Sequence, residues 1–156
     1  MEILLICRAL SLSLFIDRGE CFTINLLTDD INPKQMSPLT LAFVGDAVFE
    51  LLVREHVVAK NGSMPVAKLH KKTVKHVCAA WQFKASLILE KVLSDDERDI
   101  YRRGRNSTGS HVPKNSTPKE YRSATGVECL FGFLYFSGEI HRIHELFEYI
   151  ILNSNI

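Results

Sequence analysis

The spacing of apolar and polar positions along the chain predicts helices. Between residues 38 and 60, apolar side chains recur every three or four positions, which is the period of one helix face. These side chains are Leu41, Val44, Val48, Leu51, Leu52 and Val58. Ser37 is a preferred N-cap, Pro38 suits the first helical position, and Asn61-Gly62 is a stop signal. We therefore expect one long, largely buried helix over 38–60.

The segment that follows has the same period. Met64-Pro65 begins an apolar pattern that continues to Leu93, which is long enough for two helices. Two capping boxes come next, and they pair Ser94 with Glu97 and Thr117 with Glu120. They predict helices over 95–103 and 118–136.

A last helix is expected over 140–152, after the helix stop at Gly138. Residues 104–117 are small, polar and interrupted by Gly and Pro, so they are expected to form an exposed loop. Only residues 22–27 approach the alternation of a half-buried strand. The predicted fold class is all-α, a helical bundle.

Length and composition limit the organisation of the chain. Its 156 residues suffice for one domain with a core, and 46% apolar and 24% charged residues are typical of a globular protein. Residues 1–28 are interpreted as an N-terminal extension of uncertain status, either natural or the result of an early start site, and residues 29–156 as the domain. The apolar run in this extension is too short to span a membrane, and the extension lacks the basic n-region of a signal peptide.

Four cysteines are far apart and form no CxxC pair, so the sequence predicts neither a zinc site nor a disulfide framework. Reduced thiols fit a cytosol-like compartment. For Cys78 and Cys129, which have apolar neighbours, we expect the role of small buried hydrophobic residues.

Two acidic residues stand among apolar neighbours in predicted helices. Asp46 follows Gly45 in the 38–60 helix, and Glu128 lies in the 118–136 helix. Ionised side chains are costly in such places unless a cation or hydrogen-bond donors satisfy them. Glu50 is one turn beyond Asp46 on the same face. The acids could together bind a hard cation such as magnesium, or each could pair with an Arg or Lys or cap a loop.

The middle of the chain is strongly basic although the formal net charge is only +1. No acidic residue occurs between Glu55 and Glu90, while six lysines do, and four of these share one predicted helix face: Lys68, Lys71, Lys72 and Lys75. A second cluster brackets the polar loop: Arg102, Arg103, Arg105, Lys114, Lys119 and Arg122. Such surfaces suit salt-dependent contacts with the phosphates of a nucleic acid and little recognition of its base sequence. The short side chains of Asn106 and Asn115 add hydrogen-bond donors for the same backbone.

The segment Phe43-Val44-Gly45-Asp46-Ala47-Val48 resembles the signature helix of the ribonuclease III superfamily. Residues 128–132, Glu-Cys-Leu-Phe-Gly, resemble its second signature. The branch called Mini-ribonuclease III, which lacks a double-stranded-RNA-binding domain, is matched further by three segments in the same order and spacing. These are Arg102-Arg103-Gly104-Arg105-Asn106, Pro113-Lys114-Asn115 and Tyr121-Arg122-Ser123-Ala124-Thr125.

The resemblance implies a ribonuclease III-type endonuclease fold over residues 29–156 and a Mg²⁺-dependent endoribonuclease that cleaves double-stranded RNA. It implies Asp46 and Glu128 as catalytic residues and metal ligands, with Mn²⁺ as a substitute metal. RNA-binding residues are expected in the basic clusters: Lys71, Lys72, Arg102, Arg103, Arg105, Asn106, Lys114, Asn115 and Arg122. The task implied for the branch is maturation of precursor 23S (large-subunit) ribosomal RNA in a ribosomal context. The implied form is a homodimer, located in the cytoplasm or, in a plastid-bearing organism, in the plastid stroma.

Two positions depart from the pattern of full-length ribonuclease III. Ala42 and Thr125 stand where the larger enzymes carry additional acids, and so fewer carboxylates remain for metal. This motivates an alternative, a non-catalytic RNA-binding or ribosome-associated module of the same fold. Retention of both Asp46 and Glu128 favours the enzyme.

Overall fold

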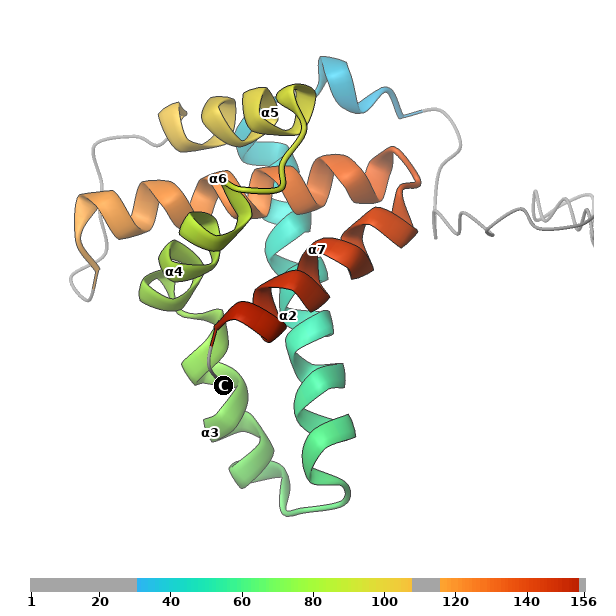
Figure 1. The fold of residues 1–156 in the computed structure, drawn as a ribbon, viewed down its shortest axis with the longest axis vertical. Coiled ribbons are helices and arrows are strands. Elements are labelled where there is room, and N and C mark those ends of the chain that lie inside the picture. Colours follow the sequence, from blue (N-terminus) through green and yellow to red (C-terminus); the bar gives the residue numbers. More distant parts are fainter. Residues whose placement is uncertain (1–30, 108–115, 155–156) are drawn as a thin grey trace, which may run out of the picture.

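The computed structural model describes residues 31–107 and 116–154, and these form an all-helical bundle (Figure 1). A short 3₁₀ helix, η1 (Pro33–Gln35), precedes six α-helices in the described part of the chain. Their bounds are α2 (Pro38–Asn61), α3 (Val66–Val77), α4 (Ala79–Leu89), α5 (Asp95–Asn106), α6 (Pro118–Phe136) and α7 (Ile140–Asn153). None of these helices is long and apolar enough to cross a bilayer.

Helix α6 lies at the centre, crossed by α2, with α4, α5 and α7 packed around it (Figure 1). The core is aromatic where α2 meets α6 and α7. The ring of Phe49 is 5.1 Å from that of Phe131 in α6 and 5.9 Å from those of Phe147 in α7 and Trp81 in α4. One fully buried side chain of α2 therefore joins three other helices.

The helix ends marked by caps and glycines are confirmed, because these signals act locally. The Ser37 hydroxyl accepts a hydrogen bond from the Thr40 N–H at 3.1 Å, and both capping boxes are formed. Gly62 and Gly138 follow α2 and α6 and have positive φ of 61° and 77°, which glycine adopts more readily than other residues. The segment after Pro65 is two helices, which separate at Cys78.

Some expectations of burial were wrong. Leu51 and Val58 are 57% and 50% exposed, because α2 is covered on one side only and the apolar positions of its sequence extend beyond that side. Cys78 is exposed at the α3–α4 junction, whereas Cys129 is buried as predicted. Helix α5 also continues to Asn106, beyond the predicted end at 103.

The continuation of α5 has a packing reason. Gly104 is buried against α6, where an added Cβ would lie 2.9 Å from the carbonyl oxygen of Thr125. A residue without a side chain therefore brings the last turn of α5 close to α6. The strand-like residues 22–27 and most of the predicted 104–117 loop lie outside the described residues.

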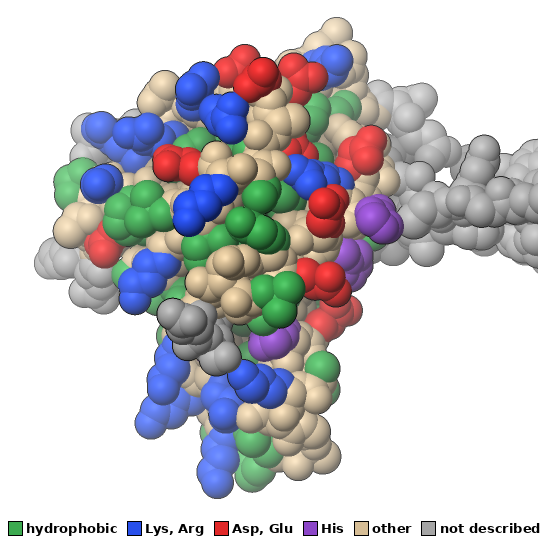
Figure 2. Space-filling view, viewed as in Figure 1, with side chains coloured by type: hydrophobic (Ala, Val, Ile, Leu, Met, Phe, Trp, Pro, Cys, Tyr) green, Lys and Arg blue, Asp and Glu red, His purple; other side chains and the backbone are tan. Residues whose placement is uncertain are grey.

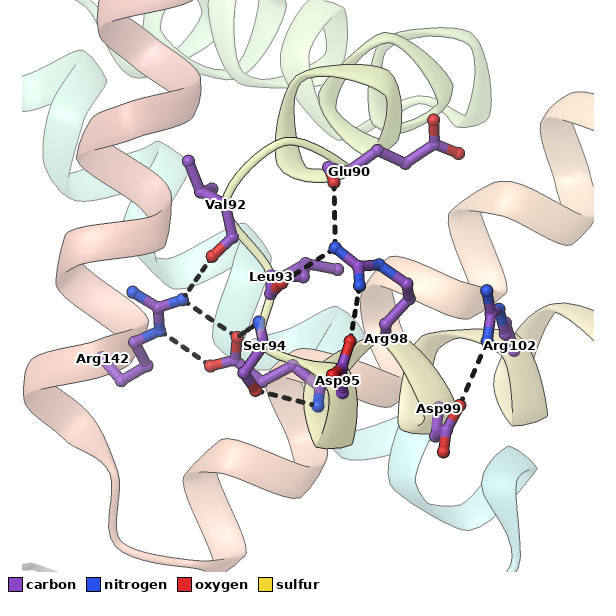
Figure 3. Close-up of polar contacts among 10 residues, drawn as sticks. Glu90, Val92, Leu93, Ser94, Asp95, Arg98, Asp99, Arg102 and Arg142 are labelled. Carbon is purple, nitrogen blue, oxygen red and sulfur yellow. Dashed lines mark hydrogen bonds and ion pairs between the residues drawn. The ribbon is translucent and has the colours of Figure 1, made fainter.

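A buried ion pair joins α7 to the start of α5 (Figure 3). The Arg142 guanidinium donates to both carboxylate oxygens of Glu97, at 2.7 and 2.9 Å, and to the Val92 carbonyl at 2.9 Å. Burial alone would raise the pKa of Glu97, but the hydrogen bonds from Arg142 and Ser94 hold that pKa below its ordinary value. The charged form of Glu97 is thus the form that stabilises the fold.

We expect Arg142→Met to lower the free energy of unfolding at pH 7 by about 3 kcal/mol, because it leaves the Glu97 carboxylate without its partner. Folding lowers the pKa of Glu97, so the ion pair stabilises the fold only while Glu97 is charged. The loss of unfolding free energy in Arg142→Met should therefore be complete above the ordinary pKa of a Glu side chain and should shrink as the pH falls below about 4. Urea unfolding over pH 3–7 measures this. The control Arg102→Met, which breaks an exposed pair with Asp99, should cost less than about 1 kcal/mol.

Candidate active site

The site lies where α2 crosses α6, and two glycines allow the helices to approach each other. A Cβ on Gly45 would overlap the Glu128 carbonyl oxygen and lie 2.6 Å from the Gly132 nitrogen. A Cβ on Gly132 would lie 2.8 Å from the Leu41 carbonyl carbon. The backbones are therefore in direct contact at Gly45, the residue before Asp46.

This crossing brings Asp46 and Glu128 to one open pocket of about 500 Å³. Its walls come from the first half of α2 and the first half of α6. The lining residues are Leu39, Ala42, Phe43, Val44, Asp46, Ala47, Glu50, Tyr121, Thr125 and Glu128. The predicted pairing of the two acids across two packed helices is thus present in the fold.

The two carboxylates differ in burial, which the sequence did not indicate. Asp46 is exposed on the outer side of α2, and Glu128 is the more buried of the two. Burial and the nearby charge of Asp46 raise the pKa of Glu128 to about 7, while Gln82 opposes the rise. Burial and the charge of Glu50 raise the pKa of Asp46. The charge of Asp46 therefore opposes ionisation of Glu128, and the charge of Glu50 opposes ionisation of Asp46.

Neither Asp46 nor Glu128 forms an ion pair with Lys or Arg in the described part of the chain. Glu50 differs, because its carboxylate accepts from the Arg54 Nε at 2.9 Å and so already has a basic partner. No group of three His, Cys, Asp or Glu side chains gathers for metal among the described residues. The candidate donor set is therefore the pair Asp46 and Glu128.

That pair fits a divalent metal of the hard class. Two carboxylates facing one open pocket supply oxygen ligands and leave room for water, the arrangement that Mg²⁺ prefers. A dication would also favour the charged forms of both carboxylates and so oppose the rise in their pKa values that burial and neighbouring charges cause. The set contains only two carboxylates, because Ala42 and Thr125 line the same pocket without one. These are the two positions at which the resemblance to full-length ribonuclease III implies additional acids in the larger enzymes. The Thr125 hydroxyl instead donates to the Tyr121 carbonyl at 3.1 Å.

The predicted RNA-binding residues fall into two groups on the surface. Lys71 and Lys72 are exposed on α3, which packs beside α2. Arg102, Arg103 and Asn106 line a shallow hollow of about 620 Å³ next to Pro38, the first residue of α2. In Figure 2, basic side chains gather at the lower end of the molecule over α3 and at the upper left over α5 and the start of α6.

The remaining members of the set are distributed unevenly. Arg105 and Arg122 are exposed near the second group, on α5 and α6. Lys114 and Asn115 lie outside the described residues. Along α2, the acidic pair therefore lies between the hollow at Pro38 and the lysines of α3.

Sequence reasoning missed Gln82, a residue of α4 whose amide faces Glu128. It is 1% exposed although it is polar. The signal that could have found it is a lone amide inside the apolar run Ala79 to Leu89.

Comparison with known proteins agrees with this geometry. Residues 39–139 match the family model described as the Ribonuclease III domain. The chain is 40% identical over 118 residues to the Mini-ribonuclease 3 of Clostridium tetani, covering 76% of this chain and 78% of that protein. It is 45% identical over 113 residues to that of a Thermoanaerobacter species, covering 72% and 79%.

A solved structure has the same fold. The X-ray crystal structure of a protein from Fusobacterium nucleatum superimposes with a TM-score of 0.71 at 26% identity, covering 79% of this chain and all of that one. The matched family model contains the whole of the Asp46–Glu128 site. The chain belongs to the ribonuclease III family, beside the Mini-ribonucleases 3, and is an endoribonuclease.

Proposed function

We propose that the chain cleaves double-stranded RNA with Mg²⁺, or Mn²⁺ in its place, held by Asp46 and Glu128. The observation that carries the proposal is the pairing of these carboxylates in one pocket without a Lys or Arg partner among the described residues. Structural acids are normally paired with a base or hydrogen-bonded when they are near one another.

The chain's own groups have separate tasks in this reaction. A bound divalent metal supplies a Lewis acid that activates water and stabilises charge on the phosphate. Asp46 and Glu128, which both line the pocket, would hold the metal there. The wide, open shape of the pocket admits a phosphodiester backbone rather than enclosing a small molecule. The basic groups on either side orient the duplex.

Recognition of RNA is proposed to depend on phosphate charge and duplex shape. The basic set contains exposed Lys and Arg with few groups suited to reading bases, which fits the A-form helix, whose deep groove side chains cannot enter. The substrate proposed within this class is precursor 23S ribosomal RNA in a ribosomal context, processed in the cytoplasm or in the plastid stroma of a plastid-bearing organism.

We expect the double charge reversal Lys71→Glu/Lys72→Glu to weaken binding of double-stranded RNA at least about tenfold and to reduce the salt dependence of binding. Binding measured by fluorescence anisotropy from 50 to 300 mM KCl tests this. The control is Lys91→Glu, a reversal of an exposed lysine just after α4, compared with Lys71→Glu and Lys72→Glu taken singly so that the change in net charge is the same. Equal losses in the three single variants would mean that only net charge matters and that α3 is not a contact surface.

A homodimer is proposed as the active form. Helix α2 exposes a row of apolar side chains beside the site, with Leu39 and Phe43 at 51% and 81% exposure. Large apolar groups at this exposure mark contact surfaces. A second copy of the same helix face would cover them and place two sites on one duplex.

The proposed function is tested by incubating the protein with a labelled RNA duplex, the matching DNA duplex and the single-stranded RNA. Cleavage of the RNA duplex alone, with Mg²⁺ and not with EDTA, is expected. Binding of the duplex without cleavage would instead support the non-catalytic module suggested by Ala42 and Thr125. Equal cleavage of DNA would overturn the RNA assignment.

A further inference from the structure

Gln82 is buried in α4 with an amide that no hydrogen bond satisfies. In the described part of the chain, buried side-chain polar atoms without a partner occur only in Gln82 and His56, and in Gln82 they are both Oε1 and Nε2. The side chain is 1% exposed. A buried amide without partners lowers stability, so packing alone does not explain a polar residue here.

The other buried polar side chains nearby are satisfied. Ser86, one turn further along α4, donates its hydroxyl to the Phe83 carbonyl at 2.7 Å. Thr73 in α3 donates to the Leu69 carbonyl at 3.1 Å. The unsatisfied state is therefore particular to Gln82 and is not general to the buried side of this region.

The residues on either side of Gln82 contact the two helices that carry the acidic pair. The residue before it, Trp81, packs its ring 5.9 Å from that of Phe49 in α2. The ring of the residue after it, Phe83, lies 5.0 Å from the Lys119 ammonium of α6. Side chains next to Gln82 in α4 thus reach α2 on one side and α6 on the other.

The Gln82 amide faces the Glu128 carboxylate. An ionised carboxylate only accepts hydrogen bonds, and so Nε2, which has two N–H donors, is the atom that can serve it. The two groups are close enough to interact but do not form a hydrogen bond of regular geometry.

We propose that Gln82 is a positioning residue that holds the Glu128 carboxylate, through a hydrogen bond from Nε2, in the orientation that binds the metal. The inference rests on the proposed function, because it takes Glu128 as a metal ligand. Groups that orient metal ligands in this way change metal affinity by about 10- to 100-fold when they are removed.

The test replaces Gln82 by its apolar isostere, Gln82→Met, and measures three quantities in parallel. Calorimetric titration of the RNA-free protein with Mn²⁺ should show about 10- to 100-fold weaker binding than in the wild type. Single-turnover cleavage should fall at fixed Mg²⁺ and recover in part at high Mg²⁺. The melting temperature of the metal-free protein should stay the same or rise, since two unsatisfied polar atoms leave the core.

The control is Ser86→Ala, which changes a satisfied polar group on the same helix and should leave Mn²⁺ binding unchanged. Wild-type Mn²⁺ affinity in Gln82→Met would overturn the proposal. A second variant, Gln82→Leu, is measured in the same way. If both variants are unfolded in the absence of metal, Gln82 is needed for packing of the core, and the proposal is overturned in that case too. A wild type that binds Mn²⁺ but does not cut RNA would refute the proposed function, while the calorimetric comparison would still decide the role of Gln82.

Discussion

Glu128→Gln is expected to slow cleavage of double-stranded RNA by about 1000-fold or more, equivalent to about 4 kcal/mol of lost transition-state stabilisation. The variant removes one of two carboxylates in the pocket and leaves an amide of nearly the same shape. It also removes the charge that makes Asp46 and Glu128 repel each other. Metal affinity should therefore fall while the metal-free protein becomes no less stable.

Three measurements on the variant separate these effects: single-turnover cleavage, RNA affinity without metal, and thermal unfolding. The matched control is Glu55→Gln, an exposed acid on α2 away from the pocket, which should cleave at the wild-type rate. If Glu128→Gln retained more than about a tenth of wild-type activity with unchanged metal dependence, Glu128 could not be a ligand of the reacting metal.

Gly132→Ala is expected to lower the free energy of unfolding by more than about 3 kcal/mol, or to prevent folding. The added Cβ would overlap the Leu41 carbonyl oxygen and lie 3.0 Å from the Gly45 nitrogen, and backbone atoms cannot move aside cheaply. The helices would have to separate at the point where they hold Asp46 and Glu128 together. Activity should fall along with stability.

Urea unfolding of Gly132→Ala beside Gly62→Ala measures this prediction. A Cβ on Gly62 meets nothing within 4 Å, so its cost comes only from the backbone conformation, φ 61° and ψ −152°, and should be about 1–3 kcal/mol. Equal losses in the two variants would show that the α2–α6 crossing tolerates a methyl group, contrary to the contact geometry.

Helix positions could be predicted from the sequence because their signals are local. Ser37, the two capping boxes and the glycines after α2 and α6 act on the nearest turn, and each ends or begins a helix where expected. Burial of single positions was less predictable. Leu51 and Val58 have the periodicity of a core, but whether a neighbour covers them depends on the placement of other helices.

The acidic pair could be predicted mainly from the resemblance, since Asp46 and Glu128 are 82 residues apart in sequence and nothing local joins them. Their unequal burial follows from the crossing geometry: the crossing lets α4 cover Glu128 and leaves Asp46 open. Long-range partners such as Gln82 for Glu128, or Arg142 for Glu97, require the packed structure to be seen. The family membership and the all-α fold expected from the motifs are confirmed.

The most direct test of the central claim is single-turnover cleavage of one RNA duplex by the wild type and by Asp46→Asn, over a Mg²⁺ titration. We predict that the wild type cuts with saturable Mg²⁺ dependence, while Asp46→Asn binds the duplex with similar affinity in the absence of metal but cuts at least about 1000-fold more slowly. Cleavage by Asp46→Asn at the wild-type rate, or wild-type cleavage that persists in EDTA, would contradict a metal-bearing pair of carboxylates at the α2–α6 crossing.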